Sequence, residues 1–363
     1  MTETAASKSF SKAYTAVREG GVGIVELTSR RGRIAVSGKD AVMFLNGLIT
    51  NDMKSLAPHT WMSAIFPTVQ GRVIALVRVF HMGDHFLIDT ESATHPIVLE
   101  LLSRFTLAGD FRVTDVTEQI AALSVQSKRA PQIISALLGE GAAPLQLLPW
   151  ENGSISLAGF AGAAVNMVCA THTGEQGFDL FIEPAKITDL RQALLEAGGV
   201  MVDDDTLEIL RIEAGVPRYG VDFDANTVVN ETGLTDAISF TKGCYIGQEI
   251  IIRIKHRGHV AKKLTGITFP GEAFEIEDPT VYSEDGHEAG RVTSWVISPQ
   301  LECTAAMAYI KFDYLKMLTP IQMQAGGQTI KGIVCNDLPL VRGTWYDLID
   351  NTPFPITSGN SGN

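Results

Sequence analysis

The chain has 363 residues, roughly the length of two or three ordinary domains. Its apolar share of 45% is enough for packed cores and excludes disorder as the dominant state. The net charge of −12 argues against a general nucleic-acid-binding protein, so contact with a polyanion would need a local basic patch.

Cysteine spacing and the N-terminus indicate the compartment. The chain has four cysteines, Cys169, Cys244, Cys303 and Cys335, and no CxxC pair. Such spacing suggests neither a zinc ribbon nor a disulfide framework and is typical of a reducing cytosol. The first 20 residues lack an apolar signal core, and no apolar run approaches the ~18 residues that span a bilayer. We therefore expect a cytoplasmic protein with no membrane partner.

Hydrophobic periodicity predicts a mixture of helices and strands in the first two thirds of the chain. Residues 1–17 are predicted to be a flexible tail. Helices are expected at residues 40–48, 96–107, 131–138, 185–197 and 205–214. Strands are expected within 64–79 on both sides of a turn at 70–72, and at 111–116, 120–124 and the end of 172–182. The acidic triplet at 203–205 reads as a helix start and not as a metal site.

The last third of the chain has a different pattern. After residue 263, short β-like runs are separated by Gly, Pro and Asp, which predicts a small all-β domain, either a barrel or a sandwich. The expected fold class is α+β with antiparallel sheets. The predicted boundaries are an α+β region at 18–255, a C-terminal β-barrel domain at 256–348 and a flexible tail at 349–363.

Residues 242–263, KGCYIGQEIIIRIKHRGHVAKK, hold the strongest candidate for chemistry. Cys244 follows Lys242 and Gly243, and a basic run comes after it. Cations near a cysteine favour the thiolate, which is both the nucleophile and the metal ligand. Gly243 and Gly247 would permit a close backbone approach. We therefore interpret Cys244, with Lys242 beside it, as a candidate catalytic thiol.

The same segment allows other interpretations. A helix at 246–255 would place Cys244 just before its N-terminus, whereas the β-branched run favours a strand. The basic run is most often a solvated face, although it could also hold an anionic ligand. Direct RNA binding by residues 253–263 is disfavoured because aromatic side chains for base stacking are absent there.

The octapeptide at 242–249 resembles the KGCYxGQE signature of the folate-binding YgfZ proteins, relatives of the glycine-cleavage T-protein. The matching residues are Lys242, Gly243, Cys244, Tyr245, Gly247, Gln248 and Glu249. Further blocks resemble the family in the same order along the chain. They are Thr50-Asn51-Asp52, Gln70-Gly71-Arg72, the turn around Glu175, the stretch 211–222, Glu231-Thr232-Gly233-Leu234 and His256-Arg257-Gly258.

The resemblance implies a ring of three subdomains, two of them interleaved α+β units and the third a C-terminal β-barrel. It implies that Glu175 and Arg211 contact a tetrahydrofolate or related folate. A carboxylate can accept paired hydrogen bonds from the pterin, and an arginine can stack on or pair with the ligand. Arg257, in the basic cluster, is a candidate for holding the glutamate tail.

One departure from the family bears on catalysis. Aminomethyltransferases carry an Asp-Asp pair on the second strand, and here Ala75 and Leu76 occupy those positions. Neither side chain can accept a proton or carry a negative charge. An active aminomethyltransferase is therefore not expected.

The resemblance implies a folate-binding accessory protein for the assembly or repair of iron–sulfur clusters, including those of tRNA-modifying enzymes. Cys244 would be a ligand of a transient cluster or a redox group, and the partners would be client or assembly proteins. The alternative is a tetrahydrofolate-dependent aminomethyltransferase of the glycine cleavage system.

Overall fold

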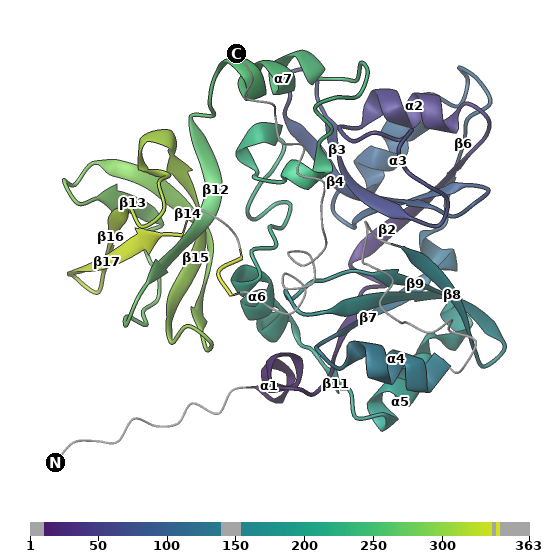
Figure 1. Ribbon diagram of the computed structural model, residues 1–363, viewed down its shortest axis with the longest axis horizontal. Helices are drawn as coiled ribbons and strands as arrows, with labels where there is room; N and C mark the ends of the chain where they lie inside the picture. Colours follow the sequence, from purple (N-terminus) through teal and green to yellow (C-terminus); the bar gives the residue numbers. More distant parts are fainter. Residues whose placement is uncertain (1–10, 139–153, 336–338, 342–363) are drawn as a thin grey trace, which may run out of the picture.

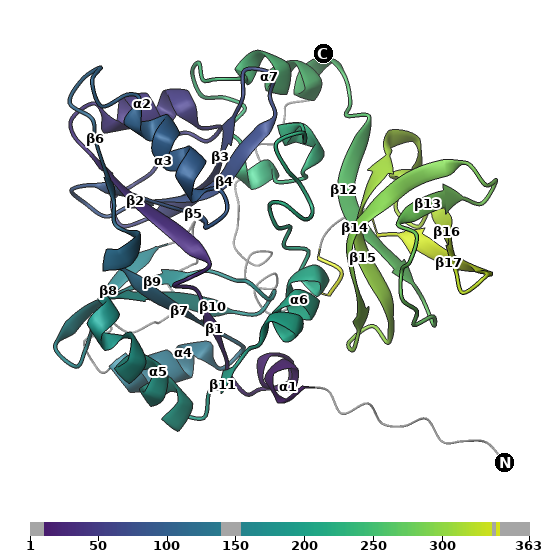
Figure 2. The same cartoon turned by 180° about the vertical axis from the view of Figure 1, so that it is seen from behind.

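The computed structural model describes residues 11–138, 154–335 and 339–341, and every element below lies in these ranges. Three parts surround the largely irregular segment 214–247 (Figure 1). They are a five-stranded sheet, a six-stranded sheet and a closed six-stranded barrel. The same three parts are seen from behind in Figure 2. This architecture confirms the predicted α+β class with a C-terminal barrel.

The five-stranded sheet has the strand order β3-β4-β5-β2-β6. Its strands are β2 (Arg31–Ser37), β3 (Trp61–Pro67), β4 (Val73–His81), β5 (Phe86–Glu91) and β6 (Arg112–Asp115). Helices α2 (Ala41–Leu48) and α3 (His95–Ser103) supply apolar side chains to the core on one face of this sheet. Both helices and the β3–β4 hairpin confirm the periodicity, although α3 ends four residues earlier than the predicted 107.

The six-stranded sheet has the order β11-β1-β7-β10-β9-β8. Its strands are β1 (Gly23–Glu26), β7 (Ala121–Gln126), β8 (Ile155–Phe160), β9 (Ala163–Cys169), β10 (Gly177–Ile182) and β11 (Val200–Met201). Helices α4 (Ala130–Leu138) and α5 (Ile187–Glu196) pack on it. Because β1 precedes the five-stranded sheet in the chain and β7 follows it, the two α+β units are interleaved.

The two sheets pack against each other through an apolar cluster that includes Val25, Phe80 and Phe181. The rings of Phe80 and Phe181 lie edge to face with centroids 5.6 Å apart, a preferred geometry for aromatic pairs. The interface continues into the buried charged side chains of Arg78, Asp89 and Asp179. The two sheets therefore form one packed unit.

The barrel closes between its first and last strands, β12 and β17. Its strands are β12 (Lys262–Phe269), β13 (Thr280–Ser283), β14 (Glu288–Ser298), β15 (Cys303–Lys311), β16 (Pro320–Ala325) and β17 (Gln328–Val334). Closure removes exposed strand edges and decides the sequence alternatives in favour of a barrel over a sandwich. Helix α6 (Asp204–Glu213) packs against β14 and connects the barrel with the rest of the chain.

The N-terminus differs from the prediction of a tail over 1–17. Residues Lys12–Arg18 form helix α1, whose start is capped by the Ser11 hydroxyl accepting from the Tyr14 amide. The helix buries Tyr14 and Val17, and burial of these side chains explains why the segment is ordered. Residues 1–10 and 349–363 lie outside the described ranges.

Two local predictions on the remaining helices are confirmed. Asp203 accepts a hydrogen bond from the Thr206 amide at 2.8 Å, so the acidic triplet caps α6. The segment after Cys244 is a helix and not a strand: α7 spans Gln248–Arg257. It extends two residues past the predicted boundary at 255. The remaining short 3₁₀ turns are η1 (Thr117–Gln119), η2 (Pro184–Lys186), η3 (Val229–Glu231), η4 (Thr235–Ala237) and η5 (Phe312–Tyr314).

Candidate functional site

The Lys242 ammonium is buried and bound by the protein itself. Its Nζ donates to the carbonyls of Asn46 at 2.7 Å and Ile49 at 3.0 Å, and also to that of Asn51. These carbonyls lie at and after the C-terminal end of α2, where helix carbonyls lack partners and favour a cation. Burial lowers the pKa of Lys242 to about 8, although Asp52 raises it. The contacts give Lys242 a docking role, and a catalytic role for it stays a prediction.

The Thr50-Asn51-Asp52 block forms hydrogen bonds with residues 236–239, which lie just before Lys242. The Thr50 hydroxyl donates to the carbonyl of Ala237 at 2.6 Å, and the Ser239 amide donates to the carbonyl of Thr50 at 3.0 Å. The Asn51 side-chain amide donates to the Asp236 carbonyl at 2.9 Å. Two blocks about 190 residues apart in sequence, 50–52 and 236–242, thus meet in space. The sequence showed the blocks but not that they touch.

Gly247 lies against the turn of the β3–β4 hairpin. It has a φ of +77°, and a Cβ built there would lie 2.4 Å from the Thr68 carbonyl oxygen. A Cβ on Gly71 of the same turn, where φ is +70°, would lie 3.2 Å from the Ile250 side chain. Since only glycine adopts such φ values without strain and leaves this space open, both glycines permit the contact between the two motifs.

Gly247→Ala is expected to lower the free energy of unfolding by ~2–3 kcal/mol, because strain from positive φ adds to the clash with Thr68. Gly243→Ala is the matched control, since a Cβ there meets no atom within 4 Å. Urea unfolding of the two variants measures the difference. Equal loss of stability in both would show that the contact with the hairpin turn is not what position 247 requires.

Cys244 is exposed, whereas Cys169 and Cys303 are buried and Cys335 is half-buried. It lies four residues before Gln248, the first residue of α7. The Gln248 side chain donates to the Lys242 carbonyl at a long 3.5 Å. The position of Cys244 before a helix N-terminus agrees with the helical alternative. The loop thus presents an exposed thiol on a docked backbone.

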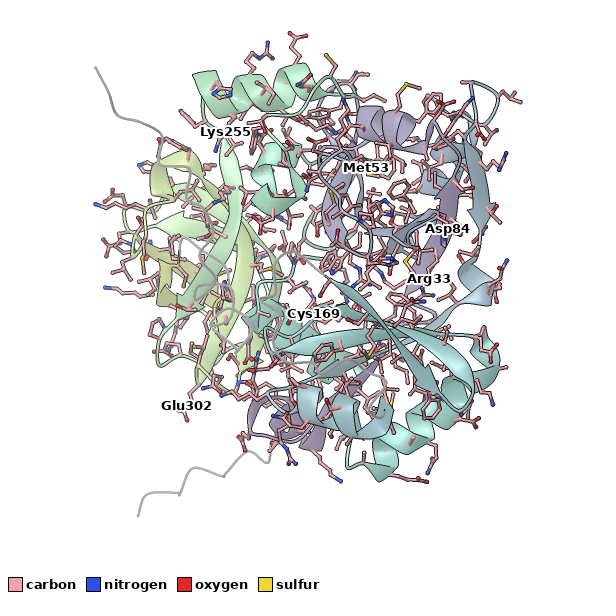
Figure 3. The ribbon with its side chains drawn as sticks, turned by 45° about the vertical axis from the view of Figure 1, so that its right-hand side comes forward. Arg33, Met53, Asp84, Cys169, Lys255 and Glu302 are labelled. Carbon is pink, nitrogen blue, oxygen red and sulfur yellow. The ribbon has the colours of Figure 1, made fainter. Side chains whose placement is uncertain are left out.

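The rest of the signature is partly at the surface. Glu249 is exposed, as are Lys255 and His256 on α7. Lys255 lies with its Nζ 4.9 Å from the centre of the Phe240 ring. Figure 3 labels Lys255 beside α7 and the buried Cys169 among the strands of the six-stranded sheet. The side chain of Arg257 lies outside the described part of the structure, so its predicted role stays a prediction.

Glu175 is buried, with 3% of its surface exposed, in an ion network. Its Oε1 accepts from Arg18 Nη1 at 2.9 Å. The same guanidinium bonds Glu213 at 2.8 Å, and Glu213 accepts from the hydroxyls of Tyr14 at 2.9 Å and Ser298 at 2.6 Å. The network ties α1, α6 and barrel strand β14 to the turn that carries Glu175. A ligand at Glu175 would share this carboxylate with Arg18.

Arg211 belongs to a second network. Its guanidinium bonds Asp222 at 2.7 Å and also Glu208, one turn earlier on α6. Asp222 accepts from the hydroxyls of Thr293 at 2.7 Å and Ser294 at 2.6 Å on β14. Although burial opposes it, Glu208 and Asp222 raise the pKa of Arg211 above its ordinary value. Its described hydrogen bonds go to these two carboxylates and to the Val216 carbonyl at 3.2 Å.

The predicted site residues fall into two regions. Glu175 and Arg211 both belong to networks that reach α6 and β14. Cys244 belongs to the loop docked on α2 and the β3–β4 turn, next to α7. The bonds from Arg18 to Glu175 and from Arg211 to Asp222 do not involve the loop that carries Cys244. A joint site of all three stays a prediction.

The two apolar positions on β4 face opposite ways. Ala75 is fully buried in the core under α2 and α3. Leu76 is half-buried and belongs to a different cluster, with Tyr219, Phe223 and Tyr245. Successive strand residues point to opposite faces, so only position 76 borders the irregular segment. Of the two positions where the resemblance leads us to expect an acid, position 76 is therefore the one at which a carboxylate would face this segment.

A half-buried carboxylate lies beside Leu76. β4 and β5 pair antiparallel with Val77 opposite Thr90, so one step further along this register Leu76 lies opposite Glu91. Glu91 Oε1 accepts from the backbone amide of Tyr219 at 3.2 Å. Sequence reasoning missed Glu91, because only the strand register brings it next to position 76.

Buried charges link the two sheets. Arg78 on β4 bonds Asp89 on β5 at 2.8 Å and Asp179 on β10 at 2.5 Å. Asp89 also accepts from Arg31, and Asp179 lies 2.9 Å from His172 Nε2. Although burial opposes it, Arg31 and Arg78 hold the pKa of Asp89 below its ordinary range. His172 and Arg78 do the same for the pKa of Asp179. Sequence reasoning missed this series of buried ion pairs as well.

Two cavities lie elsewhere. A cavity of about 360 Å³ is lined by Arg31, His95 and several hydroxyl side chains. A more apolar one of about 260 Å³ is lined by Phe80, Phe181 and neighbours between the sheets. Neither of these two is lined by Cys244, Glu175 or Arg211.

The described residues contain neither a cluster of metal-binding side chains nor a helix that could span a membrane. No group of three or more His, Cys, Asp or Glu side chains in the described ranges could hold a metal ion. No helix of the described chain has both the length and the apolar character needed to cross a membrane.

Two family models match the chain. Residues 2–242 match the GCVT N-terminal domain, and residues 262–341 match the glycine cleavage T-protein C-terminal barrel domain. The second match spans all six strands of the barrel. The first ends at Lys242, so the exposed Cys244 and α7 lie between the two matched regions.

Several named proteins are similar over most of the chain. A putative chloroplastic transferase of Arabidopsis thaliana is 26% identical over 318 residues, covering 87% of this chain and 71% of the relative. An aminomethyltransferase of a Nostoc species is 25% identical, covering 84% and 81%, and one of Rubrobacter xylanophilus is 28% identical, covering 78% and 74%. The crystal structure of the glycine cleavage system aminomethyltransferase T from Bartonella henselae has a TM-score of 0.80 and 19% identity, covering 91% and 89% of the two chains, and shares the fold.

Proposed function

We propose that this chain, which belongs to the glycine cleavage T-protein family, binds a reduced folate and serves as an accessory protein in iron–sulfur cluster assembly or repair. Clusters of tRNA-modifying enzymes are among the proposed targets. The observation that carries the accessory role is the exposed Cys244 on a docked loop. The cytoplasmic location and the client proteins stay predictions.

The folate part of the proposal has two supports. Members of the family include proteins named aminomethyltransferase, and tetrahydrofolate is the one-carbon carrier that the resemblance implies for them. On the surface beside β4, Leu76 and Tyr219 offer apolar and aromatic contact, and Glu91 adds a hydrogen-bond acceptor. Flat heterocycles with N–H groups fit such surroundings.

The accessory part follows from the chemistry of one thiol. An accessible thiolate can ligate iron or exchange with another sulfur. Because the described residues hold no group of metal-binding side chains, a cluster at Cys244 would take its other ligands from a partner protein or a small thiol. Lys242 and Gly247 would hold the backbone of this loop in place for that partner.

A second candidate is a tetrahydrofolate-dependent aminomethyltransferase, and the names of the relatives favour it. The apolar side chain at Leu76 and the buried Ala75 count against it, since neither provides an acid. Formation of methylene-tetrahydrofolate from an aminomethylated lipoyl carrier protein distinguishes the two candidates. We expect no turnover above background, and robust turnover would replace the accessory role by the enzymatic one.

Cys244→Ser is expected to lose most of the iron–sulfur enzyme activity that the wild-type chain restores in a strain lacking it, because a hydroxyl does not ligate iron as a thiolate does. Cys335→Ser, half-buried in the barrel region, is the matched control and is expected to restore activity. Activity of an iron–sulfur enzyme in cell extract is the measurement. Full restoration by Cys244→Ser would remove the role proposed for this thiol.

A further inference from the structure

We propose that the apolar cavity between the two sheets, about 260 Å³ in volume, is a second binding site, for an uncharged aromatic molecule with a ring N–H group. Indole is the simplest member of this class. The residues that line the cavity include none of those assigned above to folate or to the Cys244 loop. The inference therefore goes beyond the proposed function and does not depend on it.

The floor of the cavity is a row of side chains across the outer part of the six-stranded sheet, where β9 and β8 end the strand order (Figure 1). Asn166 on β9 pairs with Phe181 on β10 and with Leu157 on β8. Directly paired residues point to the same face of a sheet. Because the neighbours Val165 and Met167 lie in the core under α4 and α5, this row faces the five-stranded sheet.

Apolar side chains form most of the cavity wall. Phe80 and Phe181 line it from the two sheets, with their rings edge to face. Ile155 and Val168, a directly paired couple, line it as well. Leu157, beside them on β8, is 65% exposed, so the apolar surface continues outside the cavity. Such walls favour a flat aromatic ring, and the volume, slightly below that of sites for drug-sized ligands, suits one or two rings.

Small residues keep the space above the floor open. Gly159 on β8 pairs with Ala164 on β9, and Ala164 lines the cavity. A Cβ built on Gly159 would have its nearest non-neighbouring atom, the Ala163 carbonyl oxygen, at 4.0 Å. A large side chain at position 164 would therefore fill space that is now open.

Asn166 is a polar side chain in the middle of this floor, with Phe181 and Leu157 on its two sides. Its amide has no hydrogen-bond partner among residues 11–138, 154–335 and 339–341, and it lines the cavity. Asparagine is depleted from strands, and polar groups at such positions are satisfied by a ligand or by water. The amide oxygen of Asn166 can accept a hydrogen bond from the N–H group of a bound ring.

The charges around the cavity limit the charge of the ligand. Glu183 and His85 are the titratable residues of its described lining, which contains neither Lys nor Arg. The Nδ1 atom of His85 lies 2.7 Å from the Asp84 carboxylate. An anion would meet the negative charge of Glu183, whereas an N–H donor finds acceptors at both Asn166 and Glu183. Since apolar walls also disfavour any charged ligand, an uncharged donor is the best fit.

The test measures calorimetric binding of indole, and of 1-methylindole, which lacks the N–H group, to the full-length chain. Asn166→Leu keeps the size of the side chain and removes the acceptor. It is expected to weaken indole binding ~3–10-fold, the net effect of one hydrogen bond, and not to weaken binding of 1-methylindole. Ala164→Trp fills the cavity and is expected to abolish binding of both. Gln324→Trp, at an exposed strand position of the barrel, is the matched control and is expected to bind as the wild type does.

Each of four results would overturn the proposal. They are a wild-type chain that does not bind indole, indole binding that survives Ala164→Trp, equal affinity of the wild type and Asn166→Leu for indole, and equal weakening of both ligands by Asn166→Leu. A crystal structure of the wild-type chain with indole is an independent readout. The ring is expected against Phe181 with its N–H group on Asn166, and a ring bound elsewhere would also overturn the assignment.

Folate binding separates this inference from the proposed function. Ala164→Trp is expected to bind 5-formyltetrahydrofolate as the wild type does, because position 164 lies in the cavity between the sheets. Weaker folate binding by this variant would show that the two sites are not separate and would overturn the inference. A wild-type chain that binds indole but no folate would overturn the proposed folate binding alone.

Discussion

Lys242→Met is expected to lower the free energy of unfolding by ~2–4 kcal/mol. The substitution keeps the chain length of the side chain but removes the ammonium that bonds the carbonyls of Asn46, Ile49 and Asn51. Buried carbonyls that lose their donor keep the full cost of desolvation. Urea unfolding monitored by circular dichroism measures the loss. The exposed Lys39→Met is the control and is expected to change stability by less than ~0.5 kcal/mol.

The pH dependence gives a second readout of the same side chain. Burial lowers the pKa of Lys242 to about 8, below the ordinary 10.5. Between these values the unfolded chain binds more protons at Lys242 than the folded chain, so this residue makes stability rise with pH in that window. The difference in stability between wild type and Lys242→Met is expected to grow from pH 8 to 10.5. A difference that stays constant would contradict a pKa of Lys242 lowered by burial.

Arg78→Met is expected to cost ~3–5 kcal/mol of stability, the range measured when one partner of a buried ion pair is removed. Asp89 and Asp179 are both fully buried and would lose their shared cation. Thermal unfolding at neutral pH measures the loss. Arg104→Met breaks the exposed pair with Glu100 on α3 and is expected to cost less than ~0.5 kcal/mol. Equal costs at the two sites would mean that the buried chain does not hold the sheets together.

Acid unfolding tests the same ion chain. In the wild type, Arg78 and the other cations keep the pKa values of Asp89 and Asp179 low despite burial. Carboxylates of this kind add stability above their ordinary pKa, near 3.8, and lose it as the pH falls through the folded value. Arg78→Met raises the folded pKa values, so its acid-unfolding midpoint is expected at a higher pH than that of the wild type.

Elements with clear periodicity were predictable from the sequence. The apolar spacing in residues 40–48 gives α2, the turn at Gln70-Gly71-Arg72 separates β3 from β4, and the short runs after residue 263 form the barrel. In these segments the apolar face can be recognised from residues that are close together in the sequence. Helix α1 was not predictable, because Tyr14 finds its partner Glu213 at a separation of 199 residues.

In the candidate site, too, the local features were predictable from the sequence and the contacts between distant segments were not. The exposed thiol of Cys244 and its position before a helix agree with the motif. The pairing of Lys242 with the end of α2, and of Glu91 with position 76, depends on how distant segments dock. Motif spacing therefore identified the residue types near the site but not which of them the protein already uses for its own structure.

A crystal structure of the full-length chain with 5-formyltetrahydrofolate tests the central claim most directly. The account predicts a pterin bound beside β4, in contact with Leu76 and Tyr219. A pterin bound elsewhere, for example in the cavity lined by Arg31 and His95, or no bound ligand at saturating concentration, would contradict it.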